Sequence, residues 1–139
     1  MQVKFTILCI SELRGHEMPA EGRVEELKKD LKKRRVLIKP IVVDRNTMVI
    51  LDGHCRCDAL KRLGCSKVAV KFVDYGAEEI EVERWDGGEI TKEQVIEAGL
   101  SGRLMTPKSS KHMIKNGAGK VHISEVCEDA VVPLKKLNP

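Results

Sequence analysis

The stretch that most constrains the fold is residues 50–64, ILDGHCRCDALKRLG. It begins with two apolar residues that end a strand, turns tightly through Asp52 and Gly53, and continues as a helix from about His54 to Gly64. A strand that enters a helix through a glycine turn places free backbone N–H groups and the positive end of the helix dipole above the turn. The pattern predicts an anion-binding site, although a plain helix cap by Asp52 would use the same residues.

The side chains of this turn add reactive groups to the backbone donors. Arg56 could bind a phosphate or carboxylate through two parallel hydrogen bonds. His54 could donate to a phosphate oxygen or shuttle a proton. Asp52 could accept a hydrogen bond from a hydroxyl group, or help to hold a metal ion that bridges phosphates. Cys55 could be a nucleophile at the helix N-terminus, or a thiol that merely tolerates its place.

Over the rest of the chain, the spacing of apolar residues is typical of strands in some segments and of helices in others. We expect strands at 3–10, 41–43, 48–51, 67–74 and 80–85, and helices at 20–35, 54–63 and 92–98, the last closing at Gly99. Residues 121–126 fit either a short strand or irregular structure, and residues 131–137 are expected to dock back on the core. These elements predict an α/β (α+β) fold, a small mixed sheet with helices packed around it. The 139 residues fit a single domain, 1–139, in which 104–139 forms a phosphate loop and an extension.

Composition narrows the class of protein. Aromatic residues make up only 3% of the chain, so the core must be aliphatic. The net charge of +4 mildly favours anionic ligands but is far from the composition of a dedicated nucleic-acid-binding protein. The basic run 32–35 is accordingly interpreted as a solvated helix end, with a nucleic-acid patch as the alternative.

Cysteine usage and hydropathy indicate the compartment. The chain has five cysteines, an odd number at irregular spacing, and no secretory signal, which predicts a reducing cytoplasm without a disulfide framework. The pair Cys55 and Cys57 is too close for an ordinary zinc knuckle. No apolar run approaches the roughly 18 residues of a membrane span, so no membrane association is expected.

Two further segments carry chemistry. Residues 108–112, KSSKH, form a basic, hydroxyl-rich loop after a proline, a composition that suits a phosphate or diphosphate, with an exposed polar loop as the alternative. Glu17, in the loop that leaves the first strand, could be a general base for a hydroxyl group. Trp85, the single tryptophan, could line a pocket or fill the core.

The order of these parts resembles the ParB/sulfiredoxin superfamily over residues 3–85: a strand, a His-Glu loop, a charged helix, Pro-Ile-Val-Val-Asp, and Ile-Leu-Asp-Gly-His-x-Arg. Within it the chain is most similar to the archaeal free serine kinases, whose turn reads Asp-Gly-His-His-Arg and whose later loop reads Lys-Thr-Thr-Arg-His. Residues 90–102 and 132–134 extend the likeness. Cys55 stands where those kinases have a second His, and Lys111 replaces an Arg, which loses bidentate geometry.

The resemblance implies transfer of a phosphoryl group from ADP or ATP, with Mg²⁺, to the hydroxyl of free L-serine. In the roles that it implies, Glu17 takes the serine proton, Asp52 orients the hydroxyl or a magnesium ion, and Trp85 lines the serine pocket. The transferred phosphate is surrounded by Gly53, His54, Cys55 and Arg56. The nucleotide phosphates are covered by Lys108, Ser109, Ser110 and His112. Phosphoryl transfer needs mainly positioning and charge neutralisation, which these groups supply.

Other members of the superfamily suggest alternatives. The chain could bind a nucleotide without turnover, or be a non-enzymatic ParB-like regulator that binds nucleotide or DNA. DNA binding is not favoured, because no helix-turn-helix is evident after residue 86. A sulfiredoxin activity is not expected, because in sulfiredoxins a catalytic Cys directly follows the Gly, whereas His54 follows Gly53 here. The sequence does not choose between ADP and ATP, nor does it give the oligomeric state.

Overall fold

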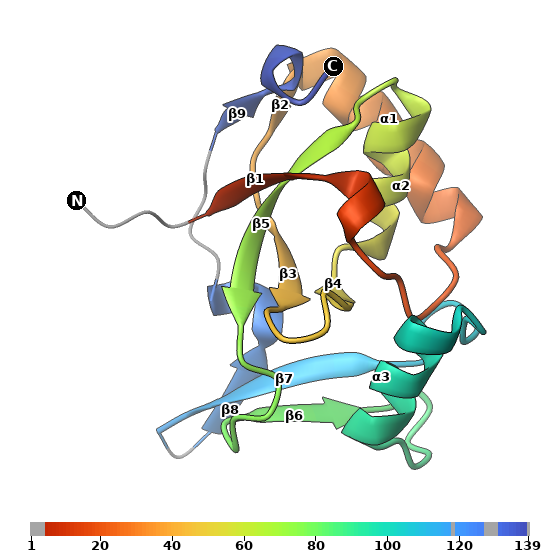
Figure 1. The fold of residues 1–139 in the computed structure, drawn as a ribbon, viewed down its shortest axis with the longest axis vertical. Helices are drawn as coiled ribbons and strands as arrows, with labels where there is room; N and C mark the ends of the chain where they lie inside the picture. The colour runs from red at the N-terminus through yellow and green to blue at the C-terminus, as the bar shows by residue number, and fades with distance from the viewer. Residues whose placement is uncertain (1–4, 118, 127–130, 139) are drawn as a thin grey trace.

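The computed structural model describes residues 5–117, 119–126 and 131–138. Its centre is a mixed four-stranded sheet in the order β1 (Thr6–Cys9), β5 (Lys67–Val73), β3 (Ile41–Asp44) and β4 (Ile50–Asp52) (Figure 1). Strands β3 and β5 are parallel, and the other two pairings are antiparallel. The parallel pair requires a crossover, which β4 and the helix after it provide. The predicted mixed sheet and the 41–51 hairpin are confirmed.

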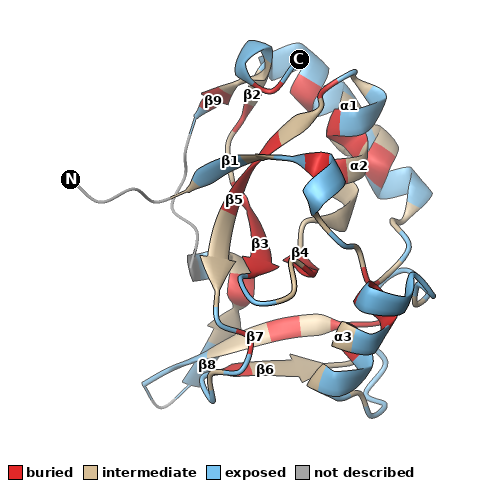
Figure 2. Cartoon of the chain, in the orientation of Figure 1, coloured by how far each residue is buried: buried red, intermediate tan, exposed pale blue. Residues whose placement is uncertain are grey.

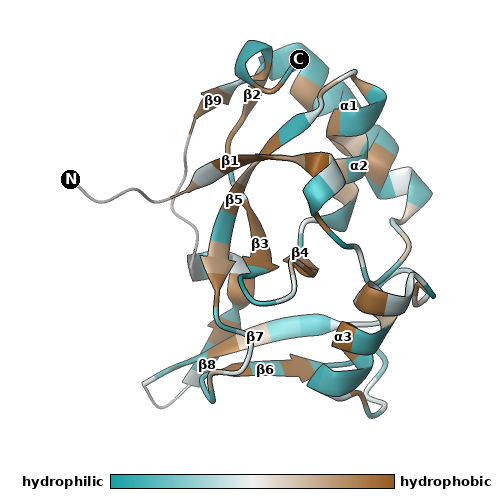
Figure 3. Ribbon diagram, in the orientation of Figure 1, coloured by the Kyte–Doolittle hydropathy of each residue, from teal (hydrophilic) through white to brown (hydrophobic). Residues whose placement is uncertain are grey.

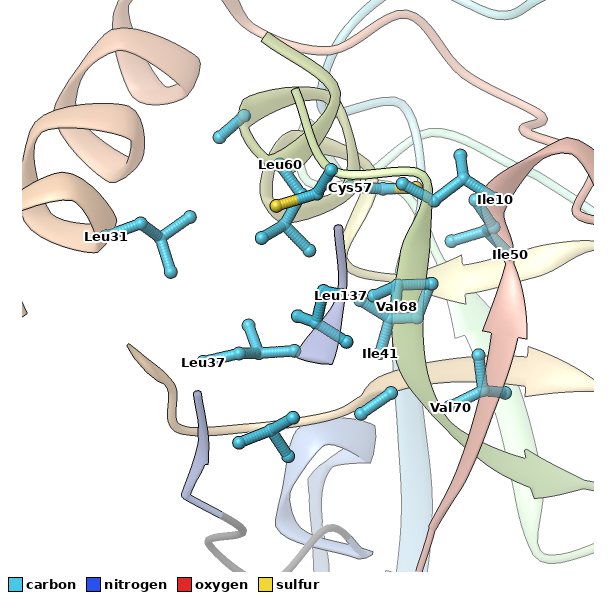
Figure 4. Close-up of a cluster of buried hydrophobic side chains, with 14 of the residues drawn as sticks. Ile10, Leu31, Leu37, Ile41, Ile50, Cys57, Leu60, Val68, Val70 and Leu137 are labelled. Carbon is cyan, nitrogen blue, oxygen red and sulfur yellow. The ribbon is translucent and has the colours of Figure 1, made fainter. Parts of the chain in front are cut away.

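Two helices cover the upper part of this sheet. Helix α1 (Glu21–Arg34) and helix α2 (His54–Arg62) pack against one another, and between them and the sheet lies an aliphatic core (Figures 2 and 4). Leu31 of α1, Leu60 of α2 and Val68 of β5 are buried in it. Each apolar side chain of this size contributes roughly 1.5–3 kcal/mol when it is fully buried. The predicted aliphatic core and the apolar stripe of the first helix are therefore both present.

A second layer lies below the central sheet. It consists of a three-stranded antiparallel sheet of β6 (Ile80–Glu83), β7 (Lys111–Asn116) and β8 (Gly119–His122), together with helix α3 (Lys92–Ser101) (Figure 1). A second apolar cluster joins this layer to the central hairpin, with Val42, Val49, Tyr75, Val95 and Ile123 among its buried members. The hairpin 41–52 therefore contributes to both cores, and the turn at Gly53 follows directly after it.

The segment 131–137 returns to the first core, as predicted. Strand β9 (Val132–Pro133) pairs with β2 (Val36–Leu37), and a short 3-10 helix, η3 (Leu134–Lys136), follows. Leu137 is fully buried, and its carbonyl accepts hydrogen bonds from the N–H groups of Ser66 and Lys67. Two other 3-10 helices, η1 (Ile10–Glu12) and η2 (Ile123–Val126), follow β1 and β8.

Three sequence-based boundaries are corrected. Helix α3 does not close at Gly99 but continues to Ser101 and is capped by Gly102. Gly99 instead allows the helix to pack closely against Val49, because a Cβ at position 99 would lie 2.6 Å from Cγ2 of Val49. The basic stretch 108–112 is a loop only as far as residue 110, since β7 begins at Lys111. Of the predicted strand 3–10, β1 covers only Thr6–Cys9, because Phe5 precedes it and Ile10 begins η1; residues 1–4 lie outside the described residues.

Hydropathy follows the layers. Figure 3 shows β3 and β4 as hydrophobic, while the outer faces of α1 and α2 are largely hydrophilic. Within the described ranges, no helix has the length and apolarity needed to cross a membrane.

Candidate active site

The turn between β4 and α2 has the geometry of an anion site. Gly53 is the N-cap residue, with φ of 111°, a left-handed conformation that favours glycine. A Cβ at this position would overlap Cγ2 of Ile41 and lie 2.7 Å from its Cβ. No side chain caps the helix, and its first turn carries no acidic residue. The first N–H groups of α2 are therefore not neutralised by a side chain, and the plain-cap alternative for Asp52 is wrong.

Asp52 pairs with Arg56 rather than capping the helix. Its Oδ2 accepts a hydrogen bond of 3.0 Å from Nη2 of Arg56, and Nη1 of the same guanidinium donates to the carbonyl of Lys39 at 3.2 Å. Both side chains are partly buried, with 18% and 24% of the Arg56 and Asp52 side chains exposed. This pair fixes the guanidinium beside the helix N-terminus, where its remaining N–H groups can meet a phosphate.

On the other side of the turn lies a buried network built on His16. The carbonyl of Ile50 can only accept, so Nδ1 of His16 donates to it, at 2.6 Å. The hydroxyl of Ser110 donates to Oε1 of Glu17 at 2.7 Å, and Nε2 of His16 lies 2.8 Å from the Ser110 oxygen. Nε2 of His16 also lies 3.3 Å from Oε1 of Glu17.

Glu17 is held as a carboxylate. Burial alone would raise its pKa, but the hydrogen bonds from His16 and Ser110, together with the nearby positive charge, lower the pKa to about 2. Its second oxygen, Oε2, accepts the N–H of Lys108 at 2.9 Å. Both oxygens of the predicted base are therefore bonded to the loop 108–110.

Two further histidines stay neutral. Burial, reinforced by the charge on His16, lowers the pKa of His54 to about 3, and the pKa of His112 likewise to about 3. Nε2 of His54 lies 3.1 Å from the N–H of His16 and accepts it, so the ring proton of His54 is on Nδ1. Nε2 of His112 is hydrogen-bonded to the hydroxyl of Tyr75 at 2.8 Å. The rings of His54 and His112 meet the ring of His16 edge to face, with centroids 4.5 and 5.7 Å away. His54 therefore suits a hydrogen-bond donor to phosphate better than a proton shuttle.

Trp85 and the loop 108–110 form one wall of the site. The indole Nε1 donates to the carbonyl of Ser110 at 3.1 Å, and the Lys111 ammonium lies 4.9 Å from the ring centroid. Trp85 is 56% exposed, so the prediction that it could fill the core is wrong. Ser109 points away from the pocket, because its hydroxyl is bonded to the carbonyl and hydroxyl of Thr106.

The cysteines play a smaller part. The Cys55 thiol makes a long contact of 3.9 Å with the carbonyl of Ala20, the residue before α1. Burial raises the pKa of the Cys57 thiol to about 11, which keeps it protonated. Cys9, Cys55, Cys57 and Cys65 are all free thiols, and Cys127 lies outside the described residues. These contacts give Cys55 no neighbouring base that would activate its thiol as a nucleophile.

One pocket of about 400 Å³ collects these groups. Among the predicted site residues it is lined by Glu17, Asp52, Gly53, His54, Cys55, Arg56, Trp85, Lys108, Ser110 and His112, and it leaves out Ser109. It also contains residues that the sequence reasoning missed, namely Arg23 and Leu27 of α1, Leu51, His122 and Ser124. Nothing in their local sequence marks them, since α1 reads as an ordinary amphipathic helix and His122 stands alone.

The pocket offers limited means of holding a metal ion. No group of three or more His, Cys, Asp or Glu side chains suited to a metal occurs in the part of the chain that the structure describes. Asp52 engages Arg56 through Oδ2, which leaves Oδ1 as the oxygen that a metal could use. A single carboxylate with substrate phosphates is a common way to bind Mg²⁺, so this donor set fits a nucleotide-bound magnesium rather than a protein-only site.

Known proteins resemble this chain in sequence over part of its length and in fold over nearly all of it. No protein-family model matches the chain. It is 41% identical over 75 residues to a ParB-like protein of Sulfolobus acidocaldarius, covering 54% of this chain and 37% of that protein. It is 29% identical over 87 residues to an ATP-dependent L-serine kinase of Staphylothermus marinus, covering 60% of this chain and 34% of that protein. The chain thus spans about a third of the length of the curated relatives it matches.

The likeness in structure extends further than the likeness in sequence. A solved structure of free serine kinase in complex with AMP matches with a TM-score of 0.78, over 99% of this chain and 95% of that chain, at 14% identity. The fold of this chain is therefore the fold of free serine kinase, and the predicted resemblance to ParB-like proteins and serine kinases is confirmed.

Proposed function

We propose that this chain transfers a phosphoryl group from ADP or ATP to the hydroxyl group of free L-serine. The observation that carries the proposal is the arrangement of one pocket. An uncapped helix N-terminus with an arginine on one side faces a partly buried carboxylate on the other. These are the two things that the reaction needs, a cradle for the transferred phosphate and an acceptor for the hydroxyl proton. The kinase-like fold and the serine kinase relatives support the same reaction.

The chemical step can be assigned to groups of this chain. The serine oxygen attacks the terminal phosphorus of the nucleotide, its proton passes to Glu17, and the bond from phosphorus to the bridging oxygen breaks to release AMP or ADP. The N–H groups that follow Gly53, Nδ1–H of His54 and the guanidinium of Arg56 stabilise the charge on the transferred group. A low pKa does not disqualify Glu17, because in a loose transition state the hydroxyl loses its proton late.

Other groups of the pocket would position the two substrates. Lys108 and Ser110 would bind nucleotide phosphates, and Trp85 would line the serine pocket, while Ser109 could contribute only its backbone. Asp52 would hold Mg²⁺ through Oδ1, and the ion would neutralise charge between the phosphates. Cys55 and His112 line the pocket, but their contacts with Ala20 and Tyr75 make them walls rather than direct phosphate ligands.

The test is direct. The protein is incubated with magnesium, L-serine and either nucleotide, and O-phosphoserine is measured. We expect product with at least one nucleotide. Glu17→Gln should abolish turnover but still bind nucleotide, whereas Glu97→Gln, which removes an exposed carboxylate on α3, should be fully active. Nucleotide binding without any product would contradict the kinase proposal and favour a binding module.

A DNA- or nucleotide-binding regulator has less support. Within residues 86–117 and 119–126, α3 is followed by the β7–β8 hairpin rather than by the second helix of a helix-turn-helix. A steep dependence of DNA affinity on salt, in the absence of phosphoserine formation, would reverse this ranking.

A further inference from the structure

The Glu17 carboxylate occupies two of the donors that the pocket offers to a phosphate. Its Oε2 takes the backbone N–H of Lys108 at 2.9 Å, and its Oε1 takes the hydroxyl of Ser110 at 2.7 Å. Lys108 has φ of 58°, a left-handed conformation that is uncommon outside glycine, and its N–H points at the carboxylate. Two donors from one short loop thus converge on the two oxygens of one anion.

The loop that carries these donors is firmly anchored at its other end. The N–H of Met105 donates to the carbonyl of His16 at 2.9 Å, and the N–H of Met18 donates to the carbonyl of Met105 at 2.8 Å. The hydroxyl of Ser109 ties the turn to Thr106. The loop therefore stays beside Glu17, and only its two donors need to change partner.

These donors suit a phosphate at least as well as a carboxylate. A backbone N–H, a hydroxyl group and the ammonium of Lys108 form an anion-binding set, and a phosphoryl group presents two oxygens in the same bidentate way as a carboxylate. Both Lys108 and Ser110 line the pocket, as Glu17 does. A phosphate that reached this wall would meet the Glu17 carboxylate as a competitor of the same charge.

We propose that Glu17 and a substrate phosphate exchange at the Lys108 N–H and the Ser110 hydroxyl, so that phosphate binding releases the carboxylate to act as the base. The consequence for catalysis rests on the proposed function, whereas the exchange itself concerns only phosphate binding. Glu17 keeps its contact with the His16 ring after the exchange, which holds it near the pocket.

The exchange changes the strength of the base. The hydrogen bond from Ser110 is one of the interactions that hold the pKa of Glu17 at about 2. When it moves to a phosphate, and the phosphate adds negative charge nearby, the pKa of Glu17 rises and the carboxylate accepts a proton more readily. The base is therefore activated only when the phosphoryl donor is in place.

The experiment measures the binding of inorganic pyrophosphate by titration calorimetry, so it needs no turnover. Glu17→Gln removes the competing anion and should bind pyrophosphate about threefold more tightly or better. The matched control, Glu97→Gln, removes an exposed carboxylate outside the pocket and should leave the affinity unchanged. In a Ser110→Ala background the gain from Glu17→Gln should be clearly smaller, because one of the two contested donors is then absent.

The results separate exchange from simple charge repulsion. Repulsion alone predicts that Glu17→Gln raises the affinity for pyrophosphate equally with and without the Ser110 hydroxyl, and that result would overturn the proposal. Equal affinity of Glu17→Gln and the unmodified protein would also overturn it. So would a failure of the protein to bind pyrophosphate at all. The amide resonance of Lys108 in the unmodified protein is a second measurement that needs no substitution. It should shift on addition of pyrophosphate, while that of Gly102 stays in place, and a fixed Lys108 resonance would also refute exchange.

The outcome is independent of the kinase assay. Exchange without phosphoserine formation would leave this inference standing and remove the proposed function. Phosphoserine formation without exchange would do the reverse.

Discussion

The clearest test of the phosphate turn is the substitution Gly53→Ala. At φ of 111° an alanine suffers the left-handed strain, which costs roughly 1–2 kcal/mol. Its Cβ would also overlap Cγ2 of Ile41 and lie 2.7 Å from Cβ of that fully buried residue, and overpacking of this kind costs roughly 1–3 kcal/mol. Together these predict a loss of about 3 kcal/mol of the free energy of unfolding, or a fall in Tm of about 10 °C.

Gly64→Ala is the matched control for this prediction. Gly64 has φ of 89°, but a Cβ there would meet nothing within 4 Å, so this substitution carries the strain without the overlap. Urea unfolding followed by circular dichroism gives both free energies. We expect Gly53→Ala to cost clearly more, and to weaken phosphate binding as well, because Nη2 of Arg56 lies 3.2 Å from the same Cβ position. Equal losses of unfolding free energy for the two substitutions would refute the argument that contact with Ile41 requires glycine at position 53.

Two other predictions concern pH and thiol access. The folded protein holds the pKa of His54 and His112 near 3, below the ordinary 6.5, so stability is full above pH 6.5 and falls as the unfolded chain takes up protons below it. Glu17, with its pKa lowered from 4.5 to about 2, extends the loss to still lower pH. A Tm that stays constant from about pH 7 to about pH 4 would contradict the lowered pKa values of the two histidines. Second, ADP should slow the alkylation of Cys55, which lines the pocket, without protecting the exposed Cys9; peptide mapping by mass spectrometry would show equal rates if the nucleotide binds elsewhere.

The parts of the site that are local in sequence could be predicted from it. The strand, the glycine turn and the helix at 50–62 follow from periodicity and from one residue that tolerates positive φ. The sequence also marked Glu17 as a possible base and the segment 108–112 as a possible phosphate loop, with an exposed polar loop as the alternative. What it could not supply is their proximity, since Glu17 and Lys108 are 91 residues apart in the chain.

The misses have the same origin. His16 is the centre of the hydrogen-bond network, but its partners Ile50 and Ser110 lie 34 and 94 residues away in the chain. No local sequence pattern predicts these contacts. Gly99 was predicted to end a helix because glycine commonly does so, but here it is needed for close packing against Val49. In both cases a tertiary contact, rather than local propensity, decides the role of the residue.

The docking of residues 132–137 on the first core has a consequence for the order in which the protein can form. Leu137 fills a core whose other members include Leu37 and Val68, and its carbonyl closes the edge at Ser66 and Lys67. Synthesis proceeds at roughly 5–20 residues per second, so Leu137 is made several seconds after β5. Until then the core between α1, α2 and the sheet lacks this side chain. Through that interval the nascent chain carries an open apolar surface, and a chaperone could recognise it there.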